Sequence, residues 1–326
     1  MTSRTLGSLW RPLRSILVVL PVLWVVISVV FLLIHLVPGD PIVQMLGEGA
    51  TASDISSLRH AYGLDAPIGI QYTRYWHGVL HADLGQSLRL HDSVTRLILQ
   101  RYPYTLALTL AALAIGIALS TPAGIWSALH RSRWPDRAVG VTSLIGLSFP
   151  NFALGPILIL IFSIKLGWLP VSGAGAGGPG LSGAIGFLLH LVLPAVTLGL
   201  GLAAILTRMV RTAMLEELNQ DYIRTARAKG LTQKQVVYGH ALRNALVPVL
   251  TVVGLQFGSL LAGAIVTETI FSWPGIGRLT LSAISNRDYP LVQGCILAVG
   301  LTYIAVNLLT DIAYTIANPR MRAERD

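Results

Sequence analysis

The sequence predicts an all-α, polytopic membrane protein with six transmembrane helices. Of its 326 residues, 53% are hydrophobic and only 12% are charged, whereas charged residues make up about a quarter of a typical soluble domain. The mean hydropathy is +0.65. Apolar stretches that reach the roughly 20 residues needed to cross a bilayer recur along the chain, and lysines and arginines fall between them. This pattern is typical of an integral membrane protein.

Six apolar segments supply the predicted spans. The first, Ile16–Val37, is longer than the roughly 7–15 apolar residues of a signal peptide and is followed by no A-x-A site, so we expect a retained span. The other five are Tyr104–Leu129, Val139–Leu166, Phe187–Thr207, Ala245–Phe271 and Leu291–Ala317. Prolines are tolerated in such spans where neighbouring helices or water satisfy the freed backbone groups, and they occur at Pro122, Pro150, Pro156, Pro194 and Pro248.

The basic residues predict the orientation of the chain. With the N-terminus inside, most of the 24 lysines and arginines fall in cytoplasmic segments, as membrane proteins prefer, and both termini are cytoplasmic. Because these residues punctuate apolar spans instead of covering a soluble face, the net charge of +9 indicates topology and not a nucleic-acid partner. The inner residues are Arg4, Arg11, Arg14, Arg131, Arg133, Arg137, Arg208, Arg211, Arg224, Arg227, Lys229, Lys234, Arg243, Arg320, Arg322 and Arg325.

The polar segment 38–101 is too long for a turn and too polar to enter lipid, so we expect an external subdomain. Aromatic residues are enriched in interface cores, and those of this segment favour a surface that receives a partner protein. A self-packed cap over the first two spans is an equally good interpretation. The aromatic residues are Tyr62, Tyr72, Tyr75 and Trp76. The predicted division of the chain is residues 1–37, 38–101, a five-helix core at 102–317 and a cytoplasmic tail at 318–326.

The longest polar segment on the inner side, Arg208–Pro248, predicts two short helices that meet at a glycine. We call this segment the elbow. Asn219 or Asp221 can cap its first helix, and Gly230 suits the left-handed C′ position that ends one.

A second helix is expected to restart directly after this glycine. Thr232 and Gln235 form a T-x-x-Q capping box, and Val237 and Ala241 make an apolar i,i+4 pair. The elbow is therefore expected to be a basic helical unit that lies along the membrane. The simpler interpretation is a solvated positive loop near lipid headgroups.

Motifs for catalysis and nucleotide binding do not occur. The glycine-rich loop Val171–Gly183 lacks the G-x-x-x-x-G-K-[ST] pattern and a lysine that could reach a phosphate. Cys295 is the single cysteine and lies in an apolar run, which excludes a disulfide framework. We therefore predict a non-enzymatic protein without cofactor or metal, and the sequence assigns no substrate-contacting residue.

Ionisable residues within the predicted spans are costly and mark candidate functional sites. His35 and Glu268 are expected near outer ends and Asp311 near an inner end, where snorkelling or capping satisfies them. His190 is expected to be a structural histidine. Because no chain of such groups crosses the bilayer centre, a proton relay is not predicted.

Blocks spread over nearly the whole chain occur in a characteristic order: HLVPGDP (His35–Pro41), YGLDAPIGIQY (Tyr62–Tyr72), ADLGQS (Ala82–Ser87), RYPYTL (Arg101–Leu106), SFPNF (Ser148–Phe152), LPVSG (Leu169–Gly173), DYIRTARAKGL (Asp221–Leu231), ALRNALVPVLT (Ala241–Thr251), ETIFSWPGIGRL (Glu268–Leu279) and RDYPLVQG (Arg287–Gly294). In these blocks the chain resembles the dipeptide/oligopeptide permease family, the membrane subunits of binding-protein-dependent ABC importers. The resemblance implies the type I ABC importer permease architecture.

The family's signature is E-A-A, then a glycine, then a distal proline, on the loop that docks to the ATPase. Arg224, Thr225 and Ala226 occupy the E-A-A positions, as is usual in the peptide-type branch, so no docking glutamate is carried over. A second departure is Ala82, where the family more often has glycine. The ATPase-coupling residues that the resemblance implies are Asp221, Tyr222, Arg224, Thr225, Ala226, Arg227, Lys229, Gly230 and Pro248.

The resemblance implies a permease subunit of an ATP-driven importer, in the cell membrane, that forms the pathway for di- or oligopeptides and couples through residues 221–235. Its implied partners are a second homologous permease subunit, two cytosolic ATP-binding subunits and an extracellular or periplasmic solute-binding protein. A nickel permease remains an alternative because that branch shares the motifs. An ion-coupled secondary transporter is the alternative from another class.

Overall fold

The computed structural model describes residues 20–32, 35–36, 41–46, 51–61, 63–87, 89–175 and 181–317. These residues are helical almost throughout, and the pairing of extended backbone among them is limited to one isolated bridge between Gln86 and Ser93. The prediction of an all-α protein is confirmed. The predicted tail 318–326 lies outside the described residues.

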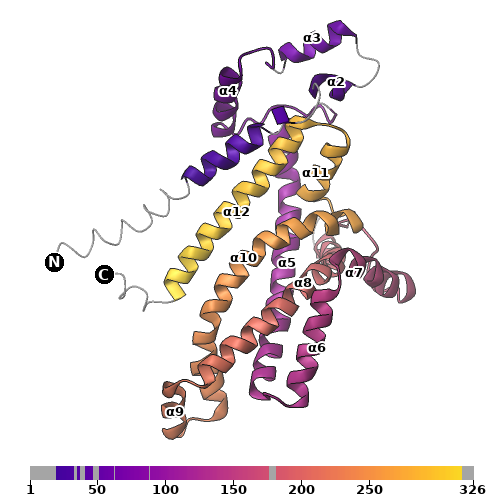
Figure 1. Cartoon of the computed structure of the whole chain (residues 1–326). Coiled ribbons are helices and arrows are strands. Elements are labelled where there is room, and N and C mark those ends of the chain that lie inside the picture. Colours follow the sequence, from indigo (N-terminus) through magenta and orange to yellow (C-terminus); the bar gives the residue numbers. More distant parts are fainter. Residues whose placement is uncertain are drawn as a thin grey trace, which may run out of the picture. The chain divides into compact units, whose positions relative to one another are not determined.

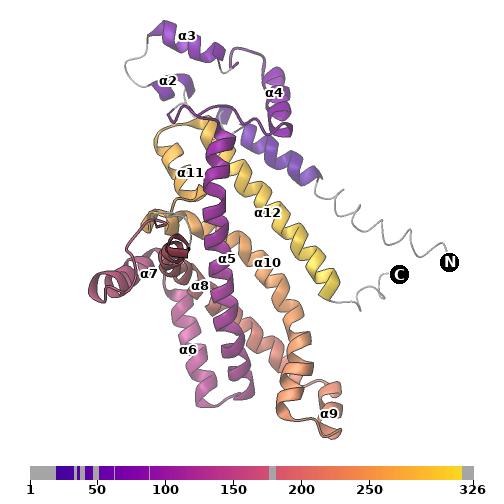
Figure 2. The same cartoon turned by 180° about the vertical axis from the view of Figure 1, so that it is seen from behind.

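Figures 1 and 2 show the helices from opposite sides. An apolar helix at Leu20–Leu32 comes first. The labelled helices are α2 (Pro41–Leu46), α3 (Ala52–Ala61), α4 (Ile68–Leu80), α5 (Val94–Leu129), α6 (Trp134–Ser148), α7 (Asn151–Leu158), α8 (Leu181–Leu218), α9 (Asp221–Ala228), α10 (Leu242–Ile270), α11 (Ile276–Ser285) and α12 (Tyr289–Ala317). A π-helical segment at Ile159–Lys165 follows α7, and a second one at Gln235–Ala241 precedes α10.

Four helices in the described part of the chain are long and apolar enough to cross a membrane: Val94–Leu129, Leu181–Leu218, Gln235–Ile270 and Tyr289–Thr310. A bent helix pair raises the number to five. The apolar helix Leu20–Leu32 falls in the predicted first span, of which residues 16–19, 33–34 and 37 lie outside the described residues. The prediction of six spans is compatible with these helices and stays a prediction.

The span expected at Val139–Leu166 is broken. α6 ends at Ser148, Phe149 is extended, and α7 begins after Pro150. The helices on the two sides of the break are bent by 105°. Proline explains the position of the break, because Pro150 has no N–H to donate to the carbonyl of Gly146 and disfavours a helical residue before it.

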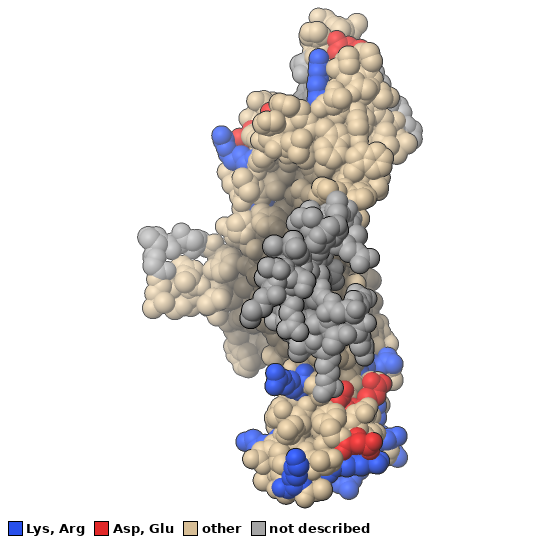
Figure 3. Space-filling model, turned by 90° about the vertical axis from the view of Figure 1, so that its left-hand side faces the viewer, with Lys and Arg blue, Asp and Glu red and all other residues tan. Residues whose placement is uncertain are grey.

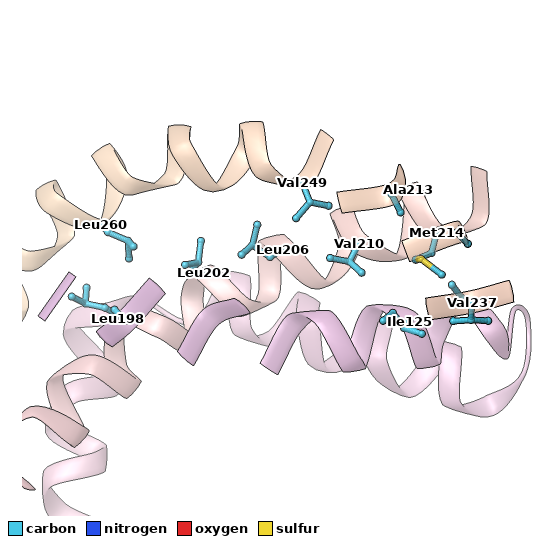
Figure 4. Packing of buried hydrophobic residues seen from close by; sticks show 14 of the residues in the cluster. Ile125, Leu198, Leu202, Leu206, Val210, Ala213, Met214, Val237, Val249 and Leu260 are labelled. Atoms are coloured by element: carbon cyan, nitrogen blue, oxygen red, sulfur yellow. The ribbon is translucent and has the colours of Figure 1, made fainter. Parts of the chain in front are cut away.

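The described residues form two units, and α5 and α12 contribute residues to both. The first unit takes in Met1–Pro103 and Gly275–Ala305, and the second takes in Tyr104–Pro274 and Val306–Asp326. In the second unit α8 packs against α10, α6 and α7. Figure 4 shows the buried row between α8 and α10, with Leu198, Leu202, Leu206 and Val210 of α8 beside Val249 and Leu260 of α10.

Glycines allow α5 to approach α8 closely. A Cβ at Gly116 would lie 2.6 Å from Leu202, and one at Gly124 would lie 2.7 Å from Val210. Both positions therefore require the smallest residue, as is common where helices pack within membranes.

Glu268 is buried more deeply than expected. Its side chain is 0% exposed in the second unit, where Thr105 Oγ1 donates a hydrogen bond of 2.6 Å to Glu268 Oε1. Glu268 lies near the end of α10, but the expectation that snorkelling satisfies its carboxylate was wrong, because the side chain is buried. The chain turns back after α10, where the backbone N–H of Trp273 donates a hydrogen bond to the backbone carbonyl of Glu268. The side chain of Trp273 is fully buried.

The aromatic residues of the segment 38–101 pack inward. Tyr72 and Tyr75 both contact Phe31, and the Tyr72 hydroxyl lies 2.7 Å from the hydroxyl of Ser28. Trp76 packs on the same cluster, whereas Tyr62 lies outside the described residues. These aromatics are half-buried against the helix Leu20–Leu32, so their placement favours the self-packed cap over an exposed aromatic docking surface.

Candidate functional site

Helix α9 of the elbow is anchored by its apolar face. Ile223 is 0% exposed and Ala226 is nearly so, and both belong to the core cluster that also contains Met214, Val236 and Val237. The polar residues of α9 lie on the opposite, exposed face. Because one face is buried in the same core as α8 and α10, α9 is a fixed part of the second unit and not the solvated loop of the simpler interpretation.

The end of α9 is set by Gly230, which has a φ of +81°. Its N–H donates to Arg227 O over 3.0 Å, and Leu231 N–H donates to Ala226 O over 3.3 Å. This pair of hydrogen bonds defines a Schellman motif with Gly230 at C′. The predicted left-handed glycine is confirmed.

The capping box that restarts the chain is also confirmed. Thr232 N–H donates to Gln235 Oε1 over 2.9 Å, and Gln235 N–H donates to Thr232 Oγ1 over 3.4 Å. The expected cap of the first helix was wrong. Gln220 is the N-cap of α9 without a side-chain bond, while Asn219 Nδ2 donates backward to Leu215 O at the end of α8.

The elbow is shorter than expected because its flanking helices are longer. α8 runs on to Leu218, and the segment beginning at Gln235 is continuous with α10, so the predicted second short helix is the start of a long one. Pro248 lies inside α10 and not at the start of a span. The turn proper is therefore α9 with the residues that join it to α8 and to Gln235.

Tyr222 connects the elbow to both long helices. Its hydroxyl donates a hydrogen bond to a carboxylate oxygen of Glu217 on α8, and it accepts one of 2.9 Å from Asn244 Nδ2 on α10. Glu217 and Asn244 were not predicted as site residues. Asn244 could have been, because it lies in one of the sequence blocks that carry the family resemblance.

The exposed face of α9 carries positive charge. Arg224 lies 3.3 Å from Asp221, with both side chains largely exposed, so this pair contributes little to stability. Arg227 and Lys229 are exposed, and Thr225 Oγ1 donates to Asp221 O within the helix. Figure 3 shows lysine and arginine side chains gathered at the end of the second unit that carries α9, with few acidic residues among them.

An ion pair between the buried Asp136 and the half-buried Arg211 ties α6 to α8 in the second unit. Arg211 Nε and Nη2 donate to the two carboxylate oxygens of Asp136 over 2.6 and 2.9 Å. Ser127 Oγ and Ser132 N–H also donate to Asp136, whose side chain is 9% exposed. Sequence reasoning assigned Arg211 to topology alone and missed the pair, because its two residues are far apart in the chain.

The remaining ionisable candidates have local partners. His35 Nε2 lies 3.2 Å from Gln71 Oε1, and His190 Nδ1 lies 2.8 Å from Gly186 O. The side chain of Asp311 is outside the described residues. Among the described residues, no group of three or more His, Cys, Asp or Glu side chains is arranged to hold a metal ion.

Four helices long and apolar enough to cross a membrane, two of them joined by the basic elbow, indicate a multi-pass helical membrane protein. The model of the family "Binding-protein-dependent transport system inner membrane component" matches residues 120–323, and the model of that family's N-terminal region matches residues 9–109. The chain belongs to this family. It is a multi-pass permease subunit of the inner, cytoplasmic membrane.

Two curated relatives cover nearly the whole chain. It is 45% identical to the di/tripeptide transport system permease protein DppB of Pseudomonas aeruginosa, over 96% of this chain and 98% of the relative. It is 41% identical to the glutathione transport system permease protein GsiC of Salmonella paratyphi A, over 95% and 98% of the two chains.

Among solved structures, the fold is similar to that of a chain from inward-facing conformations of the MetNI methionine ABC transporter. The TM-score is 0.54 at 20% identity, over 68% of this chain and 96% of that one. This likeness concerns the fold alone. It confirms the ABC importer permease architecture that the sequence predicted.

Proposed function

We propose that this chain is the permease subunit of an ATP-driven importer of short peptides, with di- and tripeptides and glutathione-like peptides as its substrate class. The carrying observation is the similarity to peptide permeases over nearly the full length of both chains. A nickel permease and an ion-coupled transporter are not favoured by these relatives. The partners we expect are a second homologous permease, two cytosolic ATP-binding subunits and a solute-binding protein.

We further propose that the elbow transmits the work of the ATPases. A lever must be stiff between its ends, and α9 is held by a buried face, a Schellman motif, a capping box and the Tyr222 hydrogen bonds. The face that would meet the ATPase carries Arg224, Arg227 and Lys229. The proposed coupling set is Asp221, Tyr222, Arg224, Thr225, Ala226, Arg227, Lys229, Gly230 and Pro248.

Purification of the chain with its neighbours tests this function. We expect the chain to copurify with ATP-binding subunits and a second permease, and the reconstituted complex to take up a labelled dipeptide only with ATP and binding protein present. The isolated chain is expected to hydrolyse no ATP. Uptake that follows an ion gradient and survives removal of ATP would contradict the proposal, and saturable uptake of Ni²⁺ without peptide uptake would replace the substrate class.

A further inference from the structure

A pocket of about 300 Å³ lies in the second unit beside the break between α6 and α7. Its wall combines Gly146, Leu147, Phe149 and Pro150 at the break with residues of α8 and α10. The volume is at the lower end of the range for small-molecule sites. The residues from the two long helices are Leu198, Gly201, Leu202, Ile205, Gln256, Ser259 and Leu260.

The pocket lies at mid-height of the long helices. Gln256 is the central residue of α10 (Leu242–Ile270), and Gly201 is close to the middle of α8 (Leu181–Leu218). Because both helices are long enough to cross a membrane, the pocket is far from either end of the span. Polar groups at such depth are retained where they face a protein cavity or each other.

Polar groups without protein partners converge on this pocket. In the described part of the chain, neither the Gln256 carboxamide nor the Ser259 hydroxyl makes a hydrogen bond. The carbonyl of Gly146 has lost its helical donor, since the residue four positions on is Pro150, and the N–H of Phe149 donates to Ile145 O instead. An amide, a hydroxyl and a freed carbonyl therefore remain available to a guest.

The remaining wall is apolar. Leu198 and Leu202 of α8 and Leu260 of α10 line it, and Figure 4 shows these three side chains between the two helices. No charged side chain of the described residues lines the pocket. A charged or metallic guest would find no countercharge here, whereas an amide unit with a small side chain would find both kinds of contact.

We propose that this pocket is a cargo subsite that takes one peptide unit during passage, a proposal that rests on the function proposed above. Gln256 and Ser259 bind the amide of the cargo, and the carbonyl of Gly146 accepts an N–H from it. The adjoining side chain of the cargo lies against Leu198, Leu202 and Leu260. Because the pocket has no charged lining residue and binds the backbone of the cargo peptide, peptides whose side chains differ in charge can all pass through it.

The test uses the complete transporter in proteoliposomes and labelled Ala-Ala. In Gln256→Leu, we expect the peptide taken up per ATP hydrolysed to fall about tenfold, because the amide of the cargo loses its hydrogen-bond partner at membrane depth. Thr251→Val is the matched control, since Thr251 is an exposed residue of the same helix that does not line the pocket. This control is expected to transport as the wild type does.

A second measurement does not depend on transport. Ser259→Cys is expected to react with a small thiol reagent, and saturating Ala-Ala with binding protein and a nonhydrolysable ATP analogue should protect it. The native Cys295 is 0% exposed and adds little background. Equal uptake per ATP by Gln256→Leu and Thr251→Val, or labelling of Ser259→Cys that peptide does not alter, would overturn the subsite. A wild-type complex that hydrolyses ATP without importing peptide would overturn the proposed function and the subsite together.

Discussion

Ala82 occupies the C′ position of a Schellman motif at the end of α4, with a φ of +56°. Its N–H donates to Val79 O, and Asp83 N–H donates to Gly78 O over 2.8 Å. The motif is the one formed around Gly230, but with a side chain where glycine is preferred. This geometry gives a physical reason for glycine at this position in the resembling family. Ser272 and Arg287 hold left-handed positions after α10 and α11 in the same way.

Ala82→Gly is expected to stabilise the protein. A left-handed alanine costs about 1–2 kcal/mol, and glycine returns about 0.5–1 kcal/mol of this through the greater freedom of the unfolded chain. The expected net gain is therefore about 0–1.5 kcal/mol, measured by thermal unfolding of the detergent-solubilised complex. Ala52→Gly, at an exposed residue outside the left-handed region, is the control and should lower stability slightly. Equal shifts in the two variants would contradict the strain.

Gly230 is expected to matter more for coupling than any single arginine of α9. A Cβ at Gly230 would meet no atom within 4 Å, so a substitution acts through the backbone, at about 1–2 kcal/mol. Gly230→Val should leave the complex assembled but lower peptide uptake per ATP, and Gly230→Asn should retain most coupling because asparagine tolerates this conformation.

Arg227→Ala is the comparison for charge. An exposed ion pair contributes about 0–1 kcal/mol, whereas driving a two-state gate fully takes about 5.5 kcal/mol, so this variant should reduce uptake only partly. Normal peptide uptake by the Gly230→Val complex together with no uptake by the Arg227→Ala complex would show that the elbow works by charge recognition.

The helices show which parts of the fold local sequence can predict. Gly230, Thr232 and Gln235 carry their own conformational signals, and the motifs predicted from them are present. Helix lengths were underestimated, because hydropathy marks the part of a helix that lipid covers while α8 continues to Leu218 on buried contacts such as Met214. Ser272 and Arg287 adopt the left-handed conformation after α10 and α11 but are not glycines, so the sequence does not indicate this conformation there. The pocket around Gln256 and the Asp136–Arg211 pair depend on which helices pack together, and a single sequence does not contain that information.

The Asp136–Arg211 pair is expected to hold α6 against α8. Removing one partner of a fully buried ion pair costs about 3–5 kcal/mol, and because the Arg211 side chain is 33% exposed the cost here is expected to be smaller. Asp136→Ala should therefore lower the melting temperature and the yield of assembled complex, as should Arg211→Met. The double variant should recover part of the loss, since neither charge is then left alone. Additive losses in the double variant would contradict a direct pair.

At the scale of the whole molecule, orientation is the property that charge predicts most directly. Lysines and arginines of the second unit gather at the end with α9, whereas α2, α3 and α4 belong to the first unit. The predicted topology places α9 in the cytoplasm and residues 38–101 outside. These placements remain predictions, and each has an exposed residue that can report on it.

Ser56→Cys in α3 and Lys234→Cys in the elbow form a matched pair, since both positions are exposed. A membrane-impermeant maleimide should label Ser56→Cys in intact cells, and Lys234→Cys only after permeabilisation, because cytoplasmic segments carry the excess of positive charge. The unsubstituted chain, whose Cys295 is buried, is the control. The reverse pattern of labelling would invert the topology.

The π-helical segment Gln235–Ala241 sets how the residues after it are rotated about the helix axis relative to the residues before it. In a π-helix each N–H donates five residues back instead of four. A π-turn thus holds one residue more than an α-turn, and a segment that rewound as α-helix with all its residues kept would turn everything after it by about 100° relative to α9, because an α-helix has 3.6 residues per turn. Gln256 and Ser259 would then face away from α8. Loss of one residue together with this rewinding would largely restore the orientation, so the extra residue and its π-helical hydrogen bonds together decide what the far end of the helix presents.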